Sequence, residues 1–112
     1  MSTVYRRAED LPWKPHSEAP GLLMKELLEP AGEAFTVRLH RIPLTGVPKH
    51  AHPRRHVIWV LSGRGRLWVE DLGDLEMEPG AFAYVPSDVL HSFYGIEQEL
   101  ELYTVSLPPE AV

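Results

Sequence analysis

Four of the six histidines in this 112-residue chain have a spacing that suits metal ligands. His50 and His52 are two residues apart, and on an extended strand such side chains point to the same face, about 6.5–7 Å apart along the chain. His56 begins the next extended segment after a proline and two arginines. His91 lies much further along, where closure of a barrel could bring it opposite the other three. The chain has no cysteine, so any metal site must be built from His, Asp and Glu.

Short extended segments separated by turn residues make up most of the sequence, which predicts an all-β barrel or sandwich. The segment from Phe35 to Ile42 alternates in polarity and is stopped by Pro43. Ser62-Gly63-Arg64-Gly65 predicts a hairpin turn, and Asp71-Leu72-Gly73-Asp74 predicts another hairpin loop. The expected strands are residues 35–42, 57–61, 66–70, 75–78, 81–85, 92–94 and 100–107.

The N-terminal part carries a weaker pattern. Residues 21–29 contain leucines at helical spacing, but the segment is short and is followed by Pro30-Ala31-Gly32, a plausible hairpin turn, so we favour a strand. Residues 1–20 hold three prolines and are expected to form an extended arm laid against the barrel, with His16 at the surface. Residues 21–112 then form a single barrel domain.

Two stretches of the sequence have a further spacing of glycine, proline and histidine, Gly46-x3-His50-x-His52-x3-His56-x6-Gly63 and Gly80-x5-Pro86-x4-His91. They resemble the first and second motifs of the cupins. The resemblance covers roughly residues 35 to 107 and implies a double-stranded β-helix, a jelly-roll barrel of two antiparallel sheets with a metal in its mouth.

The chain departs from the usual cupin pattern at three positions. His56 stands where the first motif usually has an acidic ligand, Asp88 replaces a glycine of the second motif, and Gly95 stands in place of the usual asparagine. In this respect and in length the chain resembles small single-domain cupins with four histidine ligands. That resemblance implies His50, His52, His56 and His91 as the metal ligands. For His56 the alternative is a solvent-facing side chain beside the two neighbouring arginines.

The expected wall of the substrate pocket follows from strand alternation. Ile58 follows His56 in phase, and Phe93 follows His91, so both are expected on the metal side. Arg38 and His40 share one face of their strand, either as pocket residues or as an ordinary outer-face pair. Tyr103 is a further pocket candidate. For Ile58 and Phe93 plain core packing is the competing interpretation.

The expected ligand set indicates which chemistry such a site favours. Imidazole suits Zn, Cu, Fe and Ni, and four neutral imidazoles leave the full +2 charge on a divalent ion. An open site of this kind favours a small anionic or dicarbonyl substrate that chelates the ion. We therefore expect a metal-dependent oxidoreductase of the dioxygenase type, with manganese or iron preferred and zinc, nickel or copper as alternatives.

Two other functions remain open at this stage. A non-oxidative isomerase or decarboxylase would use the same ion as a Lewis acid, and its activity would not need O2. A non-enzymatic module that binds a small ligand or a metal would show tight binding without turnover.

Charge and composition exclude several classes of function. The net charge is −5, with 16 acidic against 11 basic residues, and no basic tract exceeds two residues, so a nucleic-acid partner is not expected. No membrane span or leader is expected either, which favours a cytoplasmic protein. Eleven prolines and a single amide side chain, Gln98, favour a thermostable protein. We also expect a homodimer, in which Trp59 and Trp68 fill the outer sheet or a subunit contact and the arm is exchanged or folded back.

Overall fold

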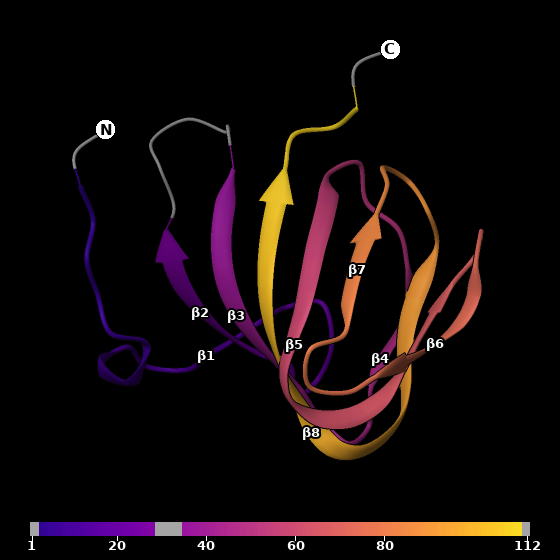
Figure 1. Cartoon of the computed structure of the whole chain (residues 1–112), viewed down its shortest axis with the longest axis horizontal. Coiled ribbons are helices and arrows are strands. Elements are labelled where there is room, and N and C mark those ends of the chain that lie inside the picture. The colour runs from indigo at the N-terminus through magenta and orange to yellow at the C-terminus, as the bar shows by residue number, and fades with distance from the viewer. Residues whose placement is uncertain (1–2, 29–34, 111–112) are drawn as a thin grey trace.

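The computed structural model describes residues 3–28 and 35–110 and is built almost entirely of β-strands (Figure 1). No helix in these two ranges is long and apolar enough to cross a membrane. One short 3-10 turn, η1 (Ala8–Asp10), precedes the strands. These are β1 (Lys14–Pro15), β2 (Leu23–Leu28), β3 (Thr36–Ile42), β4 (Val47–His50), β5 (Arg55–Val69), β6 (Gly73–Met77), β7 (Phe82–Val85) and β8 (His91–Leu107).

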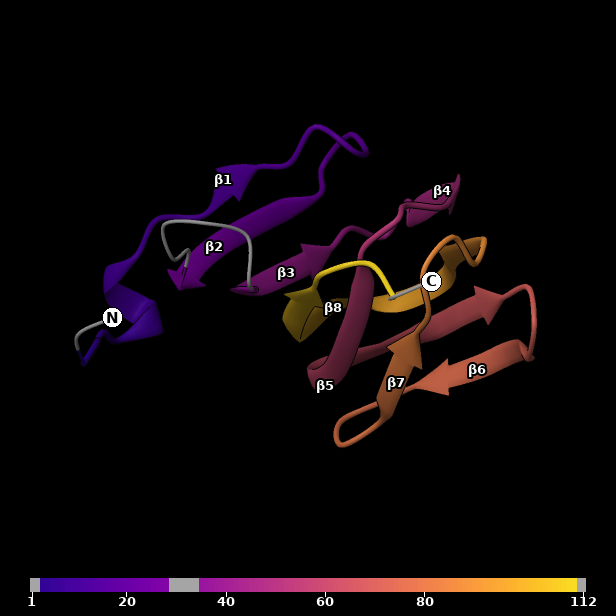
Figure 2. The same ribbon diagram turned by 90° about the horizontal axis from the view of Figure 1, so that it is seen from above.

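All strand pairings are antiparallel, and the two longest strands hold the sheet together. The order is β1-β2-β3-β8-β5-β6, while β4 pairs with β8 and β7 pairs with β5. The first half of β5 pairs with β7 and the end of β8, and its second half pairs with β6 and the start of β8. β5 and β8 therefore curve together from one layer of the barrel into the other (Figure 1). Seen from above, β1 to β3 lie on the side of the molecule opposite β6 and β7 (Figure 2). The expected all-β jelly-roll fold is confirmed.

The hairpin turn expected at residues 62–65 is wrong, because β5 runs through these residues and only bends there. The chain does not reverse there, because Ser62 and Arg64 continue to pair with β8 through a series of register shifts. Gly63 has a φ of +94°, and a Cβ on it would lie 2.1 Å from the carbonyl oxygen of Glu99. Only glycine allows the two strands to approach this closely at the corner. Because β8 stays paired with β5 through this corner, the expected strands 92–94 and 100–107 are parts of one strand, β8.

Other expectations differ from the structure only in their limits. Residues 23–28 form strand β2, as favoured from the sequence, while the expected turn at residues 30–32 lies outside the described residues. The turn expected at residues 71–74 lies at residues 70–72, because Gly73 and Asp74 already pair with β5. Between the layers lies an apolar core, whose most deeply buried large side chains are Leu67, Leu100, Leu102, Val60 and Val85.

The N-terminal arm runs along the edge of the sheet. Strand β1 pairs with β2, and the Trp13 ring has two cations close to it, with Lys25 Nζ 4.7 Å and Arg41 Cζ 4.5 Å from its centroid. Lys25 Nζ also donates a hydrogen bond to the Ala8 carbonyl oxygen at 2.8 Å. These contacts attach the arm to its own barrel and position the residues that follow Trp13 over the barrel mouth.

Candidate metal centre

Three of the expected ligands converge on one point at the barrel mouth. His50 ends β4, His52 lies in the loop after it, and His91 begins β8. The pairing of β4 with β8 places His50 opposite His91. One ligand nitrogen from each of the three rings lies within 4.8 Å of the other two. Sequence positions far apart are thus brought together by one antiparallel register.

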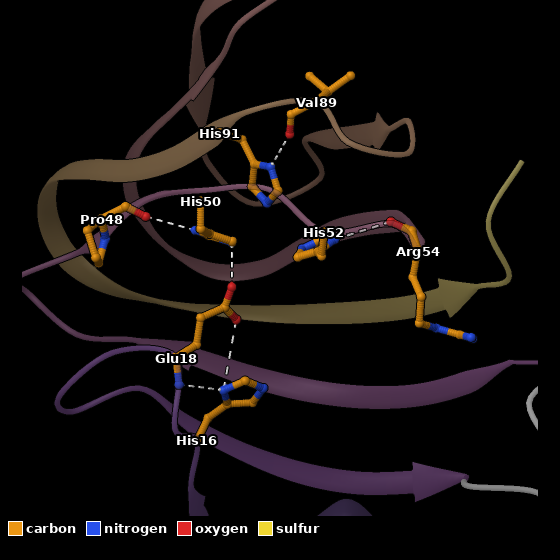
Figure 3. A network of polar contacts seen from close by, with 8 residues as sticks. All are labelled: His16, Glu18, Pro48, His50, His52, Arg54, Val89 and His91. Atoms are coloured by element: carbon orange, nitrogen blue, oxygen red, sulfur yellow. Dashed lines mark hydrogen bonds and ion pairs between the residues drawn. The ribbon is translucent and has the colours of Figure 1, made fainter.

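The three imidazoles share one hydrogen-bonding pattern, in which the backbone holds one nitrogen of each ring (Figure 3). In each of them Nδ1 faces a carbonyl oxygen two residues away, and because a carbonyl only accepts, Nδ1 carries the proton. Nε2 is then the nitrogen of each ring that is available to a metal ion. The contacts are His50 Nδ1 to Pro48 O (2.8 Å), His91 Nδ1 to Val89 O (2.8 Å) and His52 Nδ1 to Arg54 O (3.2 Å).

His56 lies beside this group without belonging to it. Its ring centroid is 4.1 Å from that of His52, and it lines the same cavity as the other three, so it does not face solvent beside the arginines. Burial, and then the neighbouring His52 and His91, lower the pKa of His56 to about 3. Burial likewise lowers the pKa of His91 to about 4. Both rings are therefore neutral at physiological pH and available as nitrogen donors.

An acidic residue that sequence reasoning missed, Glu18, reaches the centre from the arm. Its Oε1 lies 2.6 Å from His50 Nε2 (Figure 3), and its side chain is 30% exposed. The hydrogen bond to His50 lowers the pKa of Glu18 to about 2, although burial opposes this. For His50, burial alone would lower the pKa, but the contacts with Glu18 and Pro48 raise it. No spacing in the sequence marks Glu18, because its distance from the histidines depends on how the arm folds back.

His16, expected at the surface, is also part of this network. The backbone N–H of Glu18 donates to His16 Nδ1 at 3.1 Å, and the His16 ring lies 5.7 Å from that of His40. The arm thus contributes two polar side chains to the mouth of the barrel.

The centre opens into a small cavity of about 50 Å³ with mostly apolar walls. Of the expected pocket residues, His40, Ile58 and Phe93 line it. His40 Nδ1 lies 3.0 Å from Thr104 Oγ1, and burial lowers the pKa of His40 to about 4. The complete lining is Glu18, Leu22, His40, Ile42, Val47, His50, His52, His56, Ile58, His91, Phe93, Leu102 and Thr104.

Arg38 and Tyr103 are placed outside this lining. Arg38 pairs with Glu26 at 3.6 Å, and its buried Nε has no partner among the described residues. Tyr103 is 38% exposed, because β8 turns Leu102 and Thr104 inward and Tyr103 outward. The phase of this last strand was ambiguous in the sequence, and the structure resolves it against Tyr103.

Comparisons with known proteins agree with this architecture. Residues 30–107 match the family model described as Cupin domain. The chain is 33% identical over 60 residues to Uncharacterized protein SCO3923 of Streptomyces coelicolor, a match that covers 54% of this chain and just over half, 56%, of that protein.

Solved structures are similar in fold at low sequence identity. The polyketide cyclase RemF from Streptomyces resistomycificus has a TM-score of 0.80 at 18% identity, with 99% of this chain and 87% of that chain covered. A predicted oxalate decarboxylase from Thermotoga maritima has a TM-score of 0.78 at 19% identity, with 94% and 99% covered. KdgF from Halomonas sp. has a TM-score of 0.79 at 14% identity, with 96% of each chain covered.

Proposed function

This chain belongs to the cupin family, and on that premise we propose that it is a metal-dependent enzyme that acts on a small anionic or dicarbonyl compound, as an oxidoreductase of the dioxygenase type. The observation that carries the proposal is the convergence of His50, His52 and His91, each with its Nδ1 held by a backbone carbonyl so that Nε2 is the nitrogen available to a metal. Three neutral nitrogen donors on one face of an ion leave other coordination positions open, as in catalytic rather than structural sites.

The donor set fits a divalent first-row metal. His50, His52 and His91 would hold the ion, with His56 as the fourth nitrogen donor, and we favour manganese or iron over zinc, nickel or copper. The bound ion would polarise the oxygens of an anionic or dicarbonyl substrate and lower the pKa of a bound water. The carbonyls of Pro48 and Val89 would keep two of the rings in the ligating tautomer.

The remaining cavity residues would select and orient the substrate. Ile42, Ile58 and Phe93 provide apolar walls that exclude water from the reacting end of the molecule. A cavity of about 50 Å³ admits that end rather than a whole drug-sized ligand. His40, held by Thr104, presents an uncharged hydrogen-bonding ring to the same space.

One observation favours a second candidate, a non-oxidative isomerase or decarboxylase. His40 is a cavity-lining imidazole outside the three-histidine group, and a ring in that position can take part in proton transfer to or from the substrate. Isomerases and decarboxylases need such transfers, and they do not need O2.

One experiment separates these functions. The purified protein, loaded in turn with Mn²⁺ and Fe²⁺, is offered a panel of 2-oxo acids and of 1,2- and 1,3-dicarbonyl compounds, with and without O2. Metal-dependent O2 consumption supports the dioxygenase proposal, while equal turnover without O2 supports the second candidate. His52→Ala should abolish either activity, and Glu97→Ala, on the exposed surface away from the cavity, should not. Tight binding of a compound without any turnover would contradict both and indicate a binding module.

A further inference from the structure

The contact between Glu18 and His50 joins two groups that both have a role at a metal centre. Glu18 Oε1 lies 2.6 Å from His50 Nε2, the nitrogen left free by the hydrogen bond of Nδ1 to Pro48. A carboxylate oxygen and an imidazole nitrogen with a free lone pair are both electron donors. Two donors this close share a cation, which is a proton in the metal-free protein and can be a metal ion in the loaded one.

The distance is close to the separation of two neighbouring ligands on one ion. Oxygen and nitrogen ligands bind zinc at about 2.0–2.2 Å, so two of them at right angles lie roughly 3 Å apart. Relative to His50 Nε2, Oε1 of Glu18 is thus within a few tenths of an ångström of a ligand separation. Glu18 lies outside the group of three whose ligand atoms are all within 4.8 Å of one another, so its carboxylate must also swing toward His52 and His91 to bind the same ion. It approaches on the cavity side, since Glu18 is among the lining residues.

The arm is built to hold Glu18 in this position. Ala19 and Leu22, which follow it, are buried in the hydrophobic core of the barrel. The turn is closed by two backbone hydrogen bonds, from the N–H of Leu22 to Ala19 O at 3.2 Å and from the N–H of His16 to Leu22 O at 2.9 Å. The Glu18 N–H bonds to His16 Nδ1 in addition. A segment anchored in this way on both sides of Glu18 is not a chance surface contact.

We infer that Glu18 is an anionic ligand of the metal, delivered by the N-terminal arm rather than by the strand motif that supplies the histidines. The inference rests on the metal centre of the proposed function and specifies its charge. With one carboxylate bound, a divalent ion retains a net charge of +1 instead of +2. A Glu18 ligand also couples the arm to the metal, because the arm then supplies one of the groups that hold the ion.

Metal affinity of the full-length protein tests this without recourse to activity. Metal-free parent, Glu18→Gln and Glu9→Gln are titrated with Zn²⁺ and Mn²⁺ in competition with a chelator of known affinity. Glu18→Gln should weaken binding by at least about tenfold. Glu9→Gln is the matched control, since Glu9 lies in the same arm and pairs with Arg7 at the surface. Far-UV circular dichroism of the metal-free proteins checks that both variants are folded.

A spectroscopic measurement distinguishes a ligand from a nearby charge. In the Co²⁺-loaded protein, loss of a carboxylate ligand should shift the visible ligand-field bands of Glu18→Gln relative to those of the parent and of Glu9→Gln. Unchanged bands and unchanged affinity in Glu18→Gln would overturn the inference, and so would tighter binding, which would show that Glu18 competes with the metal. If His52→Ala still loses the ion in that case, the proposed metal centre stands. A parent that binds no ion would instead overturn the proposed function.

Discussion

His50 on β4 and His91 on β8 occupy the same register position of an antiparallel pair, and their ring centroids lie 4.2 Å apart. The pairing brings the two rings together at the barrel mouth. The orientation of each ring is set by the backbone carbonyl that its Nδ1 contacts. The register shifts between Val47 and His50, so the strand carries His50 into the barrel mouth after an irregularity.

Removal of the His91 side chain should remove the metal. In His91→Ala one of the three converging nitrogens is lost, and we expect metal affinity to fall by more than about tenfold. The parent should gain about 2.7 kcal/mol of stability at a free metal concentration of a hundred times Kd, and the variant should gain almost none. Elemental analysis after dialysis and thermal unfolding with and without added Zn²⁺ measure the two effects.

Ser92→Ala is the control for that substitution. Ser92 is the buried neighbour of His91 on β8 but does not line the cavity. A variant at Ser92 that lost the ion to the same degree as His91→Ala would show that the effect comes from disturbing β8 and not from removing a ligand.

The glycine at the bend of β5 should be intolerant of any side chain. Gly63→Ala places a Cβ 2.1 Å from Glu99 O at a φ of +94°, so we expect a loss of at least about 3 kcal/mol from backbone strain and forced movement of β8. Gly73→Ala is matched in conformation, with a φ of +96°, but its Cβ would meet nothing within 4 Å. It should therefore cost only about 1 kcal/mol. Urea unfolding measures both, and equal losses would contradict the steric explanation.

The metal-free protein should lose stability as the pH falls from about 6.5 to about 4. Burial, followed by His16 and Arg38, lowers the pKa of His40 to about 4, whereas Glu18 acts in the opposite sense. In the unfolded chain the histidine pKa is about 6.5, so within this window the unfolded state binds more protons and acid favours it. The contribution of His40 is fully present above pH 6.5 and amounts to at most about 3 kcal/mol.

Urea unfolding at pH 7.5 and pH 4.5 checks this, with His40→Leu as the comparison. The variant should show a shallower loss between the two pH values, because a leucine has no proton to bind. His50, whose pKa is raised, works in the opposite direction but only above about pH 6.5, and it is present in both proteins. Equal pH dependence in parent and variant would show that His40 titrates normally in the folded chain.

The expected homodimer should form through a row of exposed aromatic side chains. Trp59 pairs with Phe82 on β7 and with Tyr103 on β8, and these side chains are 53%, 62% and 38% exposed. Such a contiguous apolar row on the outside of a sheet favours association. Trp59→Glu should shift the protein to a monomer in sedimentation velocity, while Leu72→Glu, at an exposed leucine in the turn before β6, should not. A dimer that survives Trp59→Glu would point instead to exchange of the arm.

The sequence alone determined the parts of the centre that depend on local geometry. The alternation that turns Ile58 and Phe93 inward and the all-β class follow from the two-residue period of a strand. The spacing of His50 and His52 marked them as a pair, although His52 lies in the loop after β4 and not on a strand. Resemblance to the cupin motifs added His91. Each of these features needs only a few neighbouring residues, or a motif, to be recognised.

Only the tertiary structure decided the features that depend on pairings between distant segments. Glu18 reaches His50 because residues 16–22 fold back and bury Ala19 and Leu22 in the core, which no local pattern encodes. Tyr103 faces outward because the register of β8 with β3 and β5 sets its phase. Gly63 makes a bend rather than a turn because β8 stays hydrogen-bonded along both halves of β5, and the same glycine would permit either conformation in an isolated peptide.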